Sequence, residues 1–188
     1  FDGVAQGVVE WELTGQHNVA NALVCLAAAR HVGVVPELGI AALSSFMNVK
    51  RRMEKVAEVR GVTIYDDFAH HPTAIATTLD GLRKRIGGAR LIAIVEPRSN
   101  SMKLGAHRDG LPESVVQADH VFWYAPANLG WDLAATVASS TVPTTVCDSL
   151  EQIIAAVTAV AAPGTQIVVM SNGGFGGLHG KLAEALAK

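Results

Sequence analysis

Four stretches of the sequence bring together side chains that could handle charge, protons or phosphate groups. They read KRRMEKV (50–56), YDDFAHHPT (65–73), EPRSNSMKLG (96–105) and MSNGGFGG (170–177). Carboxylates and imidazoles can transfer protons or bind metals, arginines can bind phosphate or carboxylate groups, and glycines let the backbone approach a ligand closely. What each stretch can do depends on the helices and strands that position it.

The acids and histidines of residues 66–71 allow three interpretations: a metal site, an acid/base pair, or a turn between a strand and a helix. A metal site is poorly supported, because zinc-like ligand spacing is absent and adjacent side chains on an extended chain point in different directions. A turn is better supported, because Pro72 suits the first position of a helix whose positive end would lie beside Asp66 and Asp67. An exposed aspartate at a strand end could also orient water, an amine or a magnesium-bound phosphate.

The run KRRMEKV begins with three adjacent cations, and most such runs are solvated surface. The functional alternative is an arginine at a hinge. Such an arginine can swing into a phosphate site when domains close and can stabilise the charge of a phosphoryl group in transfer.

The stretch EPRSNSMKLG is a polar loop longer than a simple connection, which is typical of a functional loop. Its polar side chains are Glu96, Arg98, Ser99, Asn100 and Lys103. Arg98 could grip a carboxylate through two parallel hydrogen bonds.

The stretch MSNGGFGG leads from an apolar run into a helix-like segment, and it matches neither common nucleotide-binding loop. A Walker A loop ending at Gly180-Lys181 would need glycine where Phe175 stands and Ser or Thr where Leu182 stands. A GxGxxG fingerprint starting at Gly174 fails at His179. A flexible connection and a ligand-approaching backbone both remain open.

A further polar cluster, GQHNVANA (15–22), lies at the start of an alanine- and leucine-rich run. In a helix, His17 and Asn21 are four residues apart, and Asn18 and Asn21 three, so they share a face. The ordinary interpretation is that Asn18 caps the helix and Asn21 faces solvent. The functional interpretation is amide hydrogen bonding to a ring such as adenine, because asparagine is a poor residue inside a helix.

The composition excludes several functions. About half of the 188 residues are hydrophobic, and the net charge is −2 without a long basic run, so neither nucleic acid nor a membrane is expected as a partner. Cys25 and Cys147 lie far apart in apolar runs, which predicts buried free thiols in a reducing compartment. Without a signal peptide or an apolar run near 18 residues, a cytoplasmic location is expected. Because the chain starts at Phe1 in strand-like sequence, we expect a fragment of something longer.

The pattern of apolar residues predicts two sections. Residues 1–49 predict a short β-like start, a helix from about Asn18 to Gly33 and a second helix from Pro36 to near Phe46. From Lys50 onward, strands alternate with helices. The predicted strands are 55–59, 62–66, 91–95, 121–124, 144–147 and 166–170, the first two joined by a hairpin turn. The predicted helices follow Pro72 up to Gly87, and then cover 111–117, about 131–138, a segment capped by Ser149, and 178–188.

Strands that are apolar throughout and alternate with amphipathic helices predict an α/β fold, with a mostly parallel Rossmann-like sheet covered by helices on both faces. In such a sheet the loops after the strand ends gather at one edge, where ligands bind. The polar loops after 62–66, 91–95, 121–124 and 166–170 should therefore share one rim.

Taken together and in this order, GQHNVANA, FMNVKRRME, YDDFAHHPTAI and the two later loops resemble the Mur ligase family, the ATP-dependent amide-forming enzymes of bacterial peptidoglycan assembly. The resemblance implies that residues 1–49 are the C-terminal end of the central ATP-binding domain, a helical remnant of that ATPase domain. It implies that residues 50–188 are the C-terminal domain that binds the amino substrate. The P-loop, the Mg²⁺ ligands and the UDP-binding domain of the family have no counterpart in this sequence, so we expect the chain to be inactive alone.

Within the family, the loops 96–105 and 170–179 resemble those of the member that joins the tripeptide L-Ala-γ-D-Glu-meso-diaminopimelate to UDP-N-acetylmuramate in peptidoglycan recycling. The implied reaction needs ATP and Mg²⁺: ATP phosphorylates the carboxylate of UDP-N-acetylmuramate, and the tripeptide amine attacks the acyl phosphate. One alternative is the ligase that adds L-alanine, which has a QPHRY-type loop at 96–105. The other is a non-catalytic α/β binding module.

The resemblance also implies roles for individual residues. His17, Asn18 and Asn21 would contact adenine, and Arg52 would reach the ATP phosphates. Asp67 would lie at the phosphate and nucleophile side of the cleft, with His71 as a further catalytic candidate, while Asp66 and His70 would be mainly structural. The candidates for peptide recognition are Arg98, Ser99, Asn100, Lys103, Ser171 and Asn172.

Overall fold

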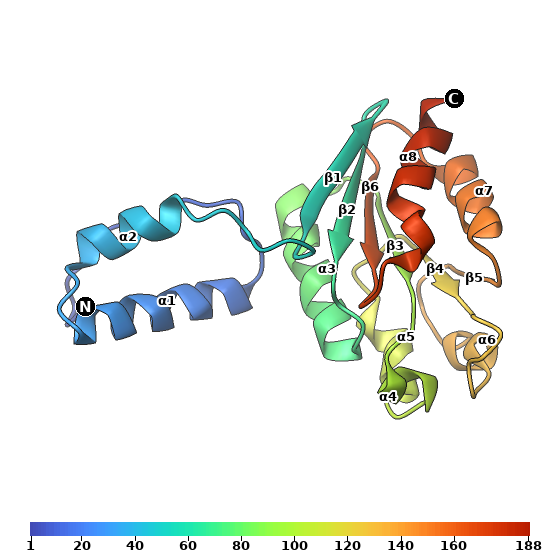
Figure 1. Cartoon of the computed structure of the whole chain (residues 1–188), viewed down its shortest axis with the longest axis horizontal. Helices are drawn as coiled ribbons and strands as arrows, with labels where there is room; N and C mark the ends of the chain where they lie inside the picture. Colours follow the sequence, from blue (N-terminus) through green and yellow to red (C-terminus); the bar gives the residue numbers. More distant parts are fainter. The chain divides into compact units, whose positions relative to one another are not determined.

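The computed structural model describes residues 1–188 and divides them into two compact units, residues 1–49 and residues 50–188. The first unit contains two helices, α1 (Gln16–His31) and α2 (Pro36–Ser44), after an N-terminal segment without regular structure (Figure 1). Both predicted helices are confirmed, with α1 beginning two residues earlier than expected. The predicted β-like start is wrong, because residues 1–15 form no strand.

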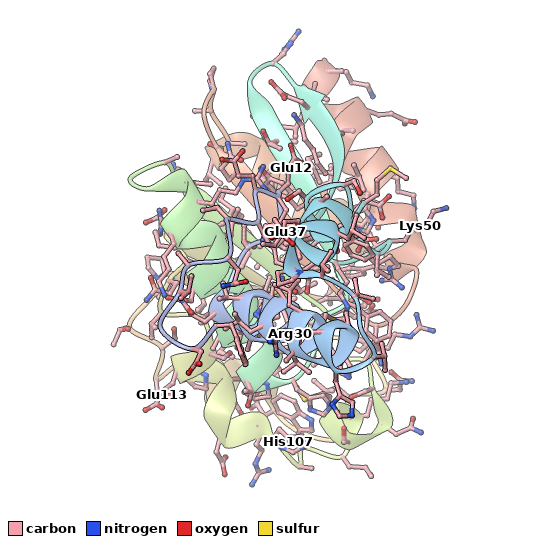
Figure 2. The ribbon with its side chains drawn as sticks, turned by 90° about the vertical axis from the view of Figure 1, so that its left-hand side faces the viewer. Glu12, Arg30, Glu37, Lys50, His107 and Glu113 are labelled. Carbon is pink, nitrogen blue, oxygen red and sulfur yellow. The ribbon has the colours of Figure 1, made fainter.

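Residues 1–49 bury very little of their own surface. Ala22 is their only buried residue, and polar side chains such as Arg30 and Glu37 are exposed (Figure 2). The prediction that Cys25 is a buried thiol is therefore wrong, because the apolar run of α1 does not lie inside a core. Cys147 is buried, as predicted.

Residues 50–188 form a six-stranded sheet in the order β1-β2-β6-β3-β4-β5 (Figure 1). The strands are β1 (Glu54–Val59), β2 (Val62–Asp67), β3 (Leu91–Val95), β4 (His120–Tyr124), β5 (Thr144–Cys147) and β6 (Gln166–Met170). All neighbouring pairs are parallel except β1 with β2, which form the predicted hairpin. Arg60 and Gly61 both have positive φ at its turn, 48° and 77°, as a two-residue hairpin turn requires.

Helices cover both faces of the sheet, which confirms the predicted fold class. They are α3 (Pro72–Ile86), α4 (Asn100–Lys103), α5 (Leu111–Ser114), α6 (Leu133–Val137), α7 (Leu150–Val160) and α8 (Leu178–Ala187), with short 3₁₀ turns at Arg108–Gly110 and Phe175–Gly177. α5 ends earlier than the predicted 117, and α4 lies in a stretch for which a loop was predicted. Four-residue helices are too short to leave a periodic pattern in the sequence.

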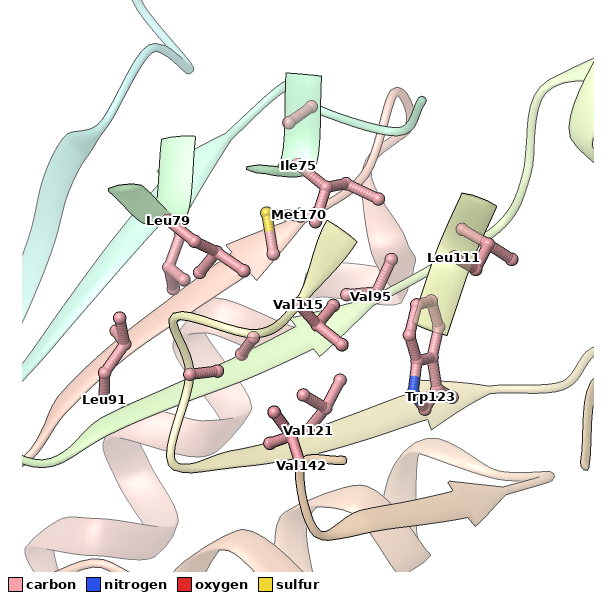
Figure 3. Close-up of a cluster of buried hydrophobic side chains, with 14 of the residues drawn as sticks. Ile75, Leu79, Leu91, Val95, Leu111, Val115, Val121, Trp123, Val142 and Met170 are labelled. Atoms are coloured by element: carbon pink, nitrogen blue, oxygen red, sulfur yellow. The ribbon is translucent and has the colours of Figure 1, made fainter. Parts of the chain in front are cut away.

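The two faces of the sheet carry separate apolar clusters. α3, α5 and α6 pack on one face through residues such as Leu79 and Leu111, around the fully buried Trp123 (Figure 3). α7 and α8 pack on the other face through residues such as Ile153 and Leu182. Because parallel strands in the middle of such a sheet are buried on both sides, β3 and most of β6 are apolar at consecutive positions.

Local signals in the sequence explain where the longer helices begin and end. Pro72 stands at the first position of α3, which ends at Gly87 with φ 59°. Ser149 caps α7, as predicted, by accepting a hydrogen bond from the Gln152 amide at 3.4 Å. None of the helices is both long enough and apolar enough to cross a membrane.

Candidate functional site

The carboxyl ends of β2, β6 and β3 lie side by side at one edge of the sheet, and β4 follows as the next strand. Met170 is level with both Asp67 and Val95 in the parallel register. The Ser171 N–H donates to the Asp67 carbonyl at 3.1 Å, and the Glu96 N–H donates to the Met170 carbonyl at 3.0 Å. The loops that were predicted to share one rim therefore start at one edge.

The Asp67 carboxylate is held by three hydrogen bonds in the centre of this edge. Oδ2 accepts from the Met53 N–H at 2.9 Å, while Oδ1 accepts from the Ala69 N–H at 2.8 Å and from the Thr78 hydroxyl at 3.2 Å. These donors come from the segment before β1, the loop after β2 and the helix α3. Asp67 thus connects three parts of the chain.

Asp67 is only 3 % exposed, so the expectation of an exposed strand-end aspartate is wrong. The segment that leads into β1 contacts it through the Met53 N–H. Burial raises the pKa of the Asp67 carboxyl, although the bonds from Ala69, Met53 and Thr78 and the positive charge of Arg52 act in the opposite direction. The geometry fits a residue that fixes the backbone around the site, and its predicted contact with phosphate or nucleophile stays a prediction.

Arg52 lies beside this carboxylate with an exposed side chain. Its guanidinium carbon is 5.5 Å from the centre of the Phe68 ring, a cation–π distance. An exposed guanidinium at the rim is suited to meeting an anionic group, and its predicted role at the ATP phosphates stays a prediction.

Arg51 is a residue of this edge that the sequence did not single out. Its Nε donates to Asp66 Oδ2 at 3.1 Å, and its Nη2 donates to the carbonyl oxygens of Ser171 and Gly173 at 2.6 Å each. The signal in the sequence was the pairing of two adjacent arginines with two adjacent aspartates. Only the fold shows that each aspartate serves a different part of the segment before β1.

Three imidazoles lie in contact next to the start of α3, one pair tilted and the other edge to face. The ring centres of His70 and His71 are 4.4 Å apart, and those of His71 and His107 are 4.8 Å apart. His71 is the N-cap residue of α3, and burial together with the nearby His70 and His107 lowers its pKa. His107 is exposed, and no motif in the sequence pointed to it.

These histidines are no metal centre: among residues 1–188, no group of three or more His, Cys, Asp or Glu side chains is arranged to hold a metal ion. The Nδ1 of His70 is instead 2.9 Å from the Phe68 carbonyl oxygen, which fits the structural role expected of His70. The catalytic role predicted for His71 stays a prediction.

The loop 96–105 is more ordered than the sequence predicted, because it contains α4. Ser99 caps this helix by accepting from the Met102 N–H at 3.3 Å, and Met102 is fully buried. Trp131 donates to the Met102 carbonyl at 2.7 Å. The hydroxyl of Ser99 is thus engaged within the loop, whereas Asn100 is exposed and Lys103 half-buried.

The loop after β6 packs against the start of this segment. The Ser171 hydroxyl donates to Glu96 Oε2 and accepts from the Gly173 N–H at 2.9 Å. The Arg98 side chain lies directly on Gly173, where a Cβ atom would be 1.5 Å from its Nη1, so a larger residue at this position would displace the arginine. Beside it, Oδ1 of Asn172 is buried without a hydrogen-bond partner. The structure therefore brings Arg98, Ser171 and Asn172 together, as the shared rim predicted.

The polar cluster at the start of α1 lies in the other unit. His17 and Asn21 are exposed, and the Asn18 side chain donates to the Thr14 carbonyl at 2.7 Å. The N-cap of α1 is Gly15, so the interpretation of Asn18 as the cap is wrong. The predicted adenine contacts of these three residues stay predictions.

Comparison with known proteins defines the class. The model of the Mur ligase glutamate ligase domain matches residues 51–173, about two thirds of the chain, and the chain therefore belongs to the Mur ligase family. The UDP-N-acetylmuramate–L-alanyl-γ-D-glutamyl-meso-2,6-diaminoheptandioate ligase of Escherichia coli K12 is 50% identical over 189 residues, which cover 100% of this chain and 41% of that protein. The ligase of the same name from Haemophilus influenzae is 45% identical over 95% of this chain. The chain spans about two fifths of the length of these curated relatives.

Solved structures of Mur ligases are similar to this chain as well. A murein peptide ligase from Psychrobacter arcticus has a TM-score of 0.75 and 45% identity, covering 100% of this chain and 41% of that chain. A single domain from a ligase of Haemophilus ducreyi has a TM-score of 0.63 and 38% identity, covering 72% of this chain and 100% of that chain. The UDP-N-acetylmuramate–alanine ligase of Thermotoga maritima shares the fold, with a TM-score of 0.74 at 19% identity over 93% of this chain and 38% of that chain.

Proposed function

We propose that the complete protein is an ATP-dependent ligase that joins the tripeptide L-Ala-γ-D-Glu-meso-diaminopimelate to UDP-N-acetylmuramate for peptidoglycan recycling in the cytoplasm. Two relatives named for this tripeptide match 95% or more of the chain at 45–50% identity. An L-alanine ligase from Clavibacter sepedonicus matches only 51% of the chain, at 42% identity. Similarity over nearly the whole chain therefore favours the tripeptide as the amino substrate.

The single structural observation that carries peptide binding is the unpartnered Oδ1 of Asn172. A buried polar atom without a partner is costly, so such an atom at a strand-end rim is a natural acceptor for a ligand N–H group. Arg98, exposed and lying on Gly173, has a guanidinium that could bind a carboxylate of the same ligand. A peptide supplies both groups.

Residues 50–188 would contribute by positioning the tripeptide amine rather than by forming bonds themselves. Asp67 fixes the segment that carries Arg52, and Arg52 would stabilise charge on the phosphoryl group in transfer. The Mg²⁺ ligands and the P-loop would belong to another part of the complete protein, as the family resemblance implies.

We propose further that residues 1–49 are the end of the ATP-binding domain, with His17, Asn18 and Asn21 near adenine. The exposed apolar side chains of α1 and α2, such as Leu23 and Leu38, support this because they need a surface to pack on. That surface would belong to the missing part of the same domain.

A ligation assay with the full-length protein tests this function. ATP, UDP-N-acetylmuramate and either the tripeptide or L-alanine are supplied, and product and released phosphate are measured. We expect phosphate release coupled to ligation of the tripeptide, with little ligation of L-alanine. Preferred ligation of L-alanine would identify the protein as the L-alanine-adding ligase. The absence of any ATP-dependent ligation would favour a non-catalytic binding module.

Variants of the same protein test the assigned residues. Arg52→Ala and Asp67→Ala should each lower kcat at least about 100-fold. Arg52→Ala removes the cation that would stabilise the phosphoryl group, and Asp67→Ala removes the hydrogen-bond acceptor that holds the segment carrying Arg52. Near-normal turnover in either variant would remove that residue from the account.

A further inference from the structure

The backbone around Arg51 is unusual. Arg51 and Met53 have positive φ angles of 61° and 51°, a conformation that side-chain-bearing residues rarely adopt. Three hydrogen bonds hold this segment: Arg51 N–H to Glu54 Oε2 at 2.9 Å, Met53 N–H to Asp67 Oδ2 at 2.9 Å, and Phe68 N–H to the Arg51 carbonyl at 2.9 Å. A strained backbone held from several sides points to a segment whose exact course matters.

The Arg51 side chain extends from this segment to the loop after β6. One guanidinium serves three acceptors: the Asp66 carboxylate and the carbonyl oxygens of Ser171 and Gly173. The planar, five-donor guanidinium can satisfy acceptors in several directions at once, which a lysine ammonium of the same charge cannot reproduce in this geometry. Arg51 thus links the segment that carries Arg52 to the loop that carries Asn172.

The buried Asp66 carboxylate depends on its contact with Arg51. Asp66 is 8 % exposed, and its other carboxylate oxygen lies 3.2 Å from Nε2 of His179 on α8, close enough for an ion pair but without the geometry of a hydrogen bond. Burial lowers the pKa of His179 although Asp66 counteracts the shift, and Arg51 is the permanently charged partner in contact with Asp66. A buried carboxylate that lost its guanidinium would be left without full compensation.

Phe68 adds a second route between the two arginines. The guanidinium carbon of Arg51 lies 5.2 Å from the centre of the Phe68 ring, and that of Arg52 lies 5.5 Å from the same centre. Both guanidinium groups therefore lie within cation–π distance of the same ring.

We infer that Arg51 is a positioning residue for the ligase reaction: it holds Arg52 and the loop 171–173 in one fixed arrangement, so that the phosphate-side cation and the peptide-side loop act together. This inference rests on the proposed function, because it assigns Arg51 an effect that passes through Arg52 and Asn172. Arg51 itself touches neither substrate.

A double-mutant cycle in the full-length enzyme tests the inference. Arg51→Gln should lower kcat about 10- to 100-fold, and Arg51→Lys at least about 5-fold. A lysine ammonium cannot make the three hydrogen bonds of the guanidinium in the same geometry. If Arg51 acts through Arg52, the double variant Arg51→Gln/Arg52→Gln should be no more than about 3-fold slower than Arg52→Gln alone. Lys50→Gln, which removes a charge from the neighbouring exposed residue, is the matched control and should retain normal kcat.

Fully multiplicative losses in the double variant, or kcat values within about 2-fold of wild type for both Arg51 variants, would overturn the inference. If Arg51→Gln does not fold, the same double-mutant cycle is measured with Arg51→Lys in its place, and the same outcomes apply. Amide ¹⁵N shifts provide a readout independent of turnover: those of Phe68, Asn172 and Gly173 should move in Arg51→Lys and stay unchanged in Lys50→Gln. Unchanged shifts in Arg51→Lys contradict the positioning role, whereas an inactive wild-type enzyme contradicts only the proposed function.

Discussion

The two units of the chain differ in how far they bury their apolar residues. Residues 1–49 bury only Ala22 and leave an apolar groove of about 610 Å³ between the N-terminal segment and the two helices. In residues 50–188, the buried apolar residues run from Val62 to Leu182 and fill both faces of a sheet. The difference indicates that residues 50–188 can fold from their own core, while residues 1–49 need apolar surface from elsewhere.

The same difference separates the two groups of candidate site residues. Three hydrogen bonds fix the Asp67 carboxylate at the sheet edge, and Arg98 and Asn172 lie in loops that start at the same edge. His17 and Asn21 lie on an exposed helix with few fixed partners. The residues proposed for peptide binding therefore belong to the unit with its own core, and those proposed for adenine belong to the unit without one.

The largest expected effect concerns folding of the separated units. Residues 50–188 expressed alone should unfold cooperatively, and residues 1–49 alone should show little helix, because short helices without a core are marginal in water. Circular dichroism during thermal unfolding measures both. A cooperative transition in residues 1–49 would remove the contrast between the units.

The next effect compares one buried and one exposed leucine. Leu79→Ala should lower the free energy of unfolding of this chain by about 3 kcal/mol, since Leu79 is fully buried on α3. Leu38→Ala should change it by less than about 0.5 kcal/mol, since Leu38 is 64 % exposed. Urea unfolding gives both values. In the full-length protein the cost of Leu38→Ala should rise to about 2 kcal/mol, and an unchanged cost there would argue against a covering domain.

Removing the Asp67 carboxylate should have a somewhat smaller effect on stability. Asp67→Ala leaves the Met53 and Ala69 amides without their acceptor and should cost about 2 kcal/mol in residues 50–188. Asp80→Ala is the matched control: Asp80 pairs only with Lys84 at the surface of α3, and its loss should cost about 0.3 kcal/mol. Equal costs for the two variants would show that Asp67 does not fix the segment before β1.

The smallest effect depends on pH and lies away from the rim, at the amino end of β3. Burial opposes ionisation of Asp119, but hydrogen bonds from the Leu91 N–H and Arg83 outweigh it and hold the pKa of Asp119 below its ordinary value. A carboxyl whose pKa is lower in the folded state stabilises the fold above its unfolded pKa, and this contribution is lost as the pH falls through the folded pKa. Asp119→Asn should therefore cost about 1 kcal/mol at pH 7, discounted because the side chain is half exposed, and nothing in strong acid. A cost that persists unchanged at low pH would contradict this assignment.

Much of the fold could be predicted from the sequence because its signals are local. Pro72, Gly87 and the Ser149 cap mark helix ends, and the apolar strands with alternating helices define a parallel sheet. The short helices α4 and α5 could not be predicted so well, because four residues carry no period. The exposure of Cys25 was mispredicted because an apolar helix is assumed to be buried, and that assumption fails for residues 1–49.

The sequence predicted which residues gather at the site, but not their burial or their hydrogen bonds. The rule that parallel strands end at one edge brought Asp67, Arg98 and Asn172 together in advance. It could not show that Asp67 is buried and that its carboxylate accepts a hydrogen bond from Met53, which precedes β1 and lies 14 residues away in sequence. Nor could it identify Arg51, whose three acceptors are 15 to 122 residues away in sequence.

The most direct test of the central claim, that residues 50–188 carry the peptide site, is a titration of ¹⁵N-labelled residues 50–188 with the tripeptide, followed by NMR. The amides of Arg98 to Lys103 and of Ser171 to Gly173 should shift, those of Arg83 and Asp119 at the other edge should not, and Asn172→Ala should weaken the binding. L-Alanine at the same concentration should produce much smaller shifts. Shifts of equal size with L-alanine, or an unperturbed rim at saturating tripeptide, would contradict the account.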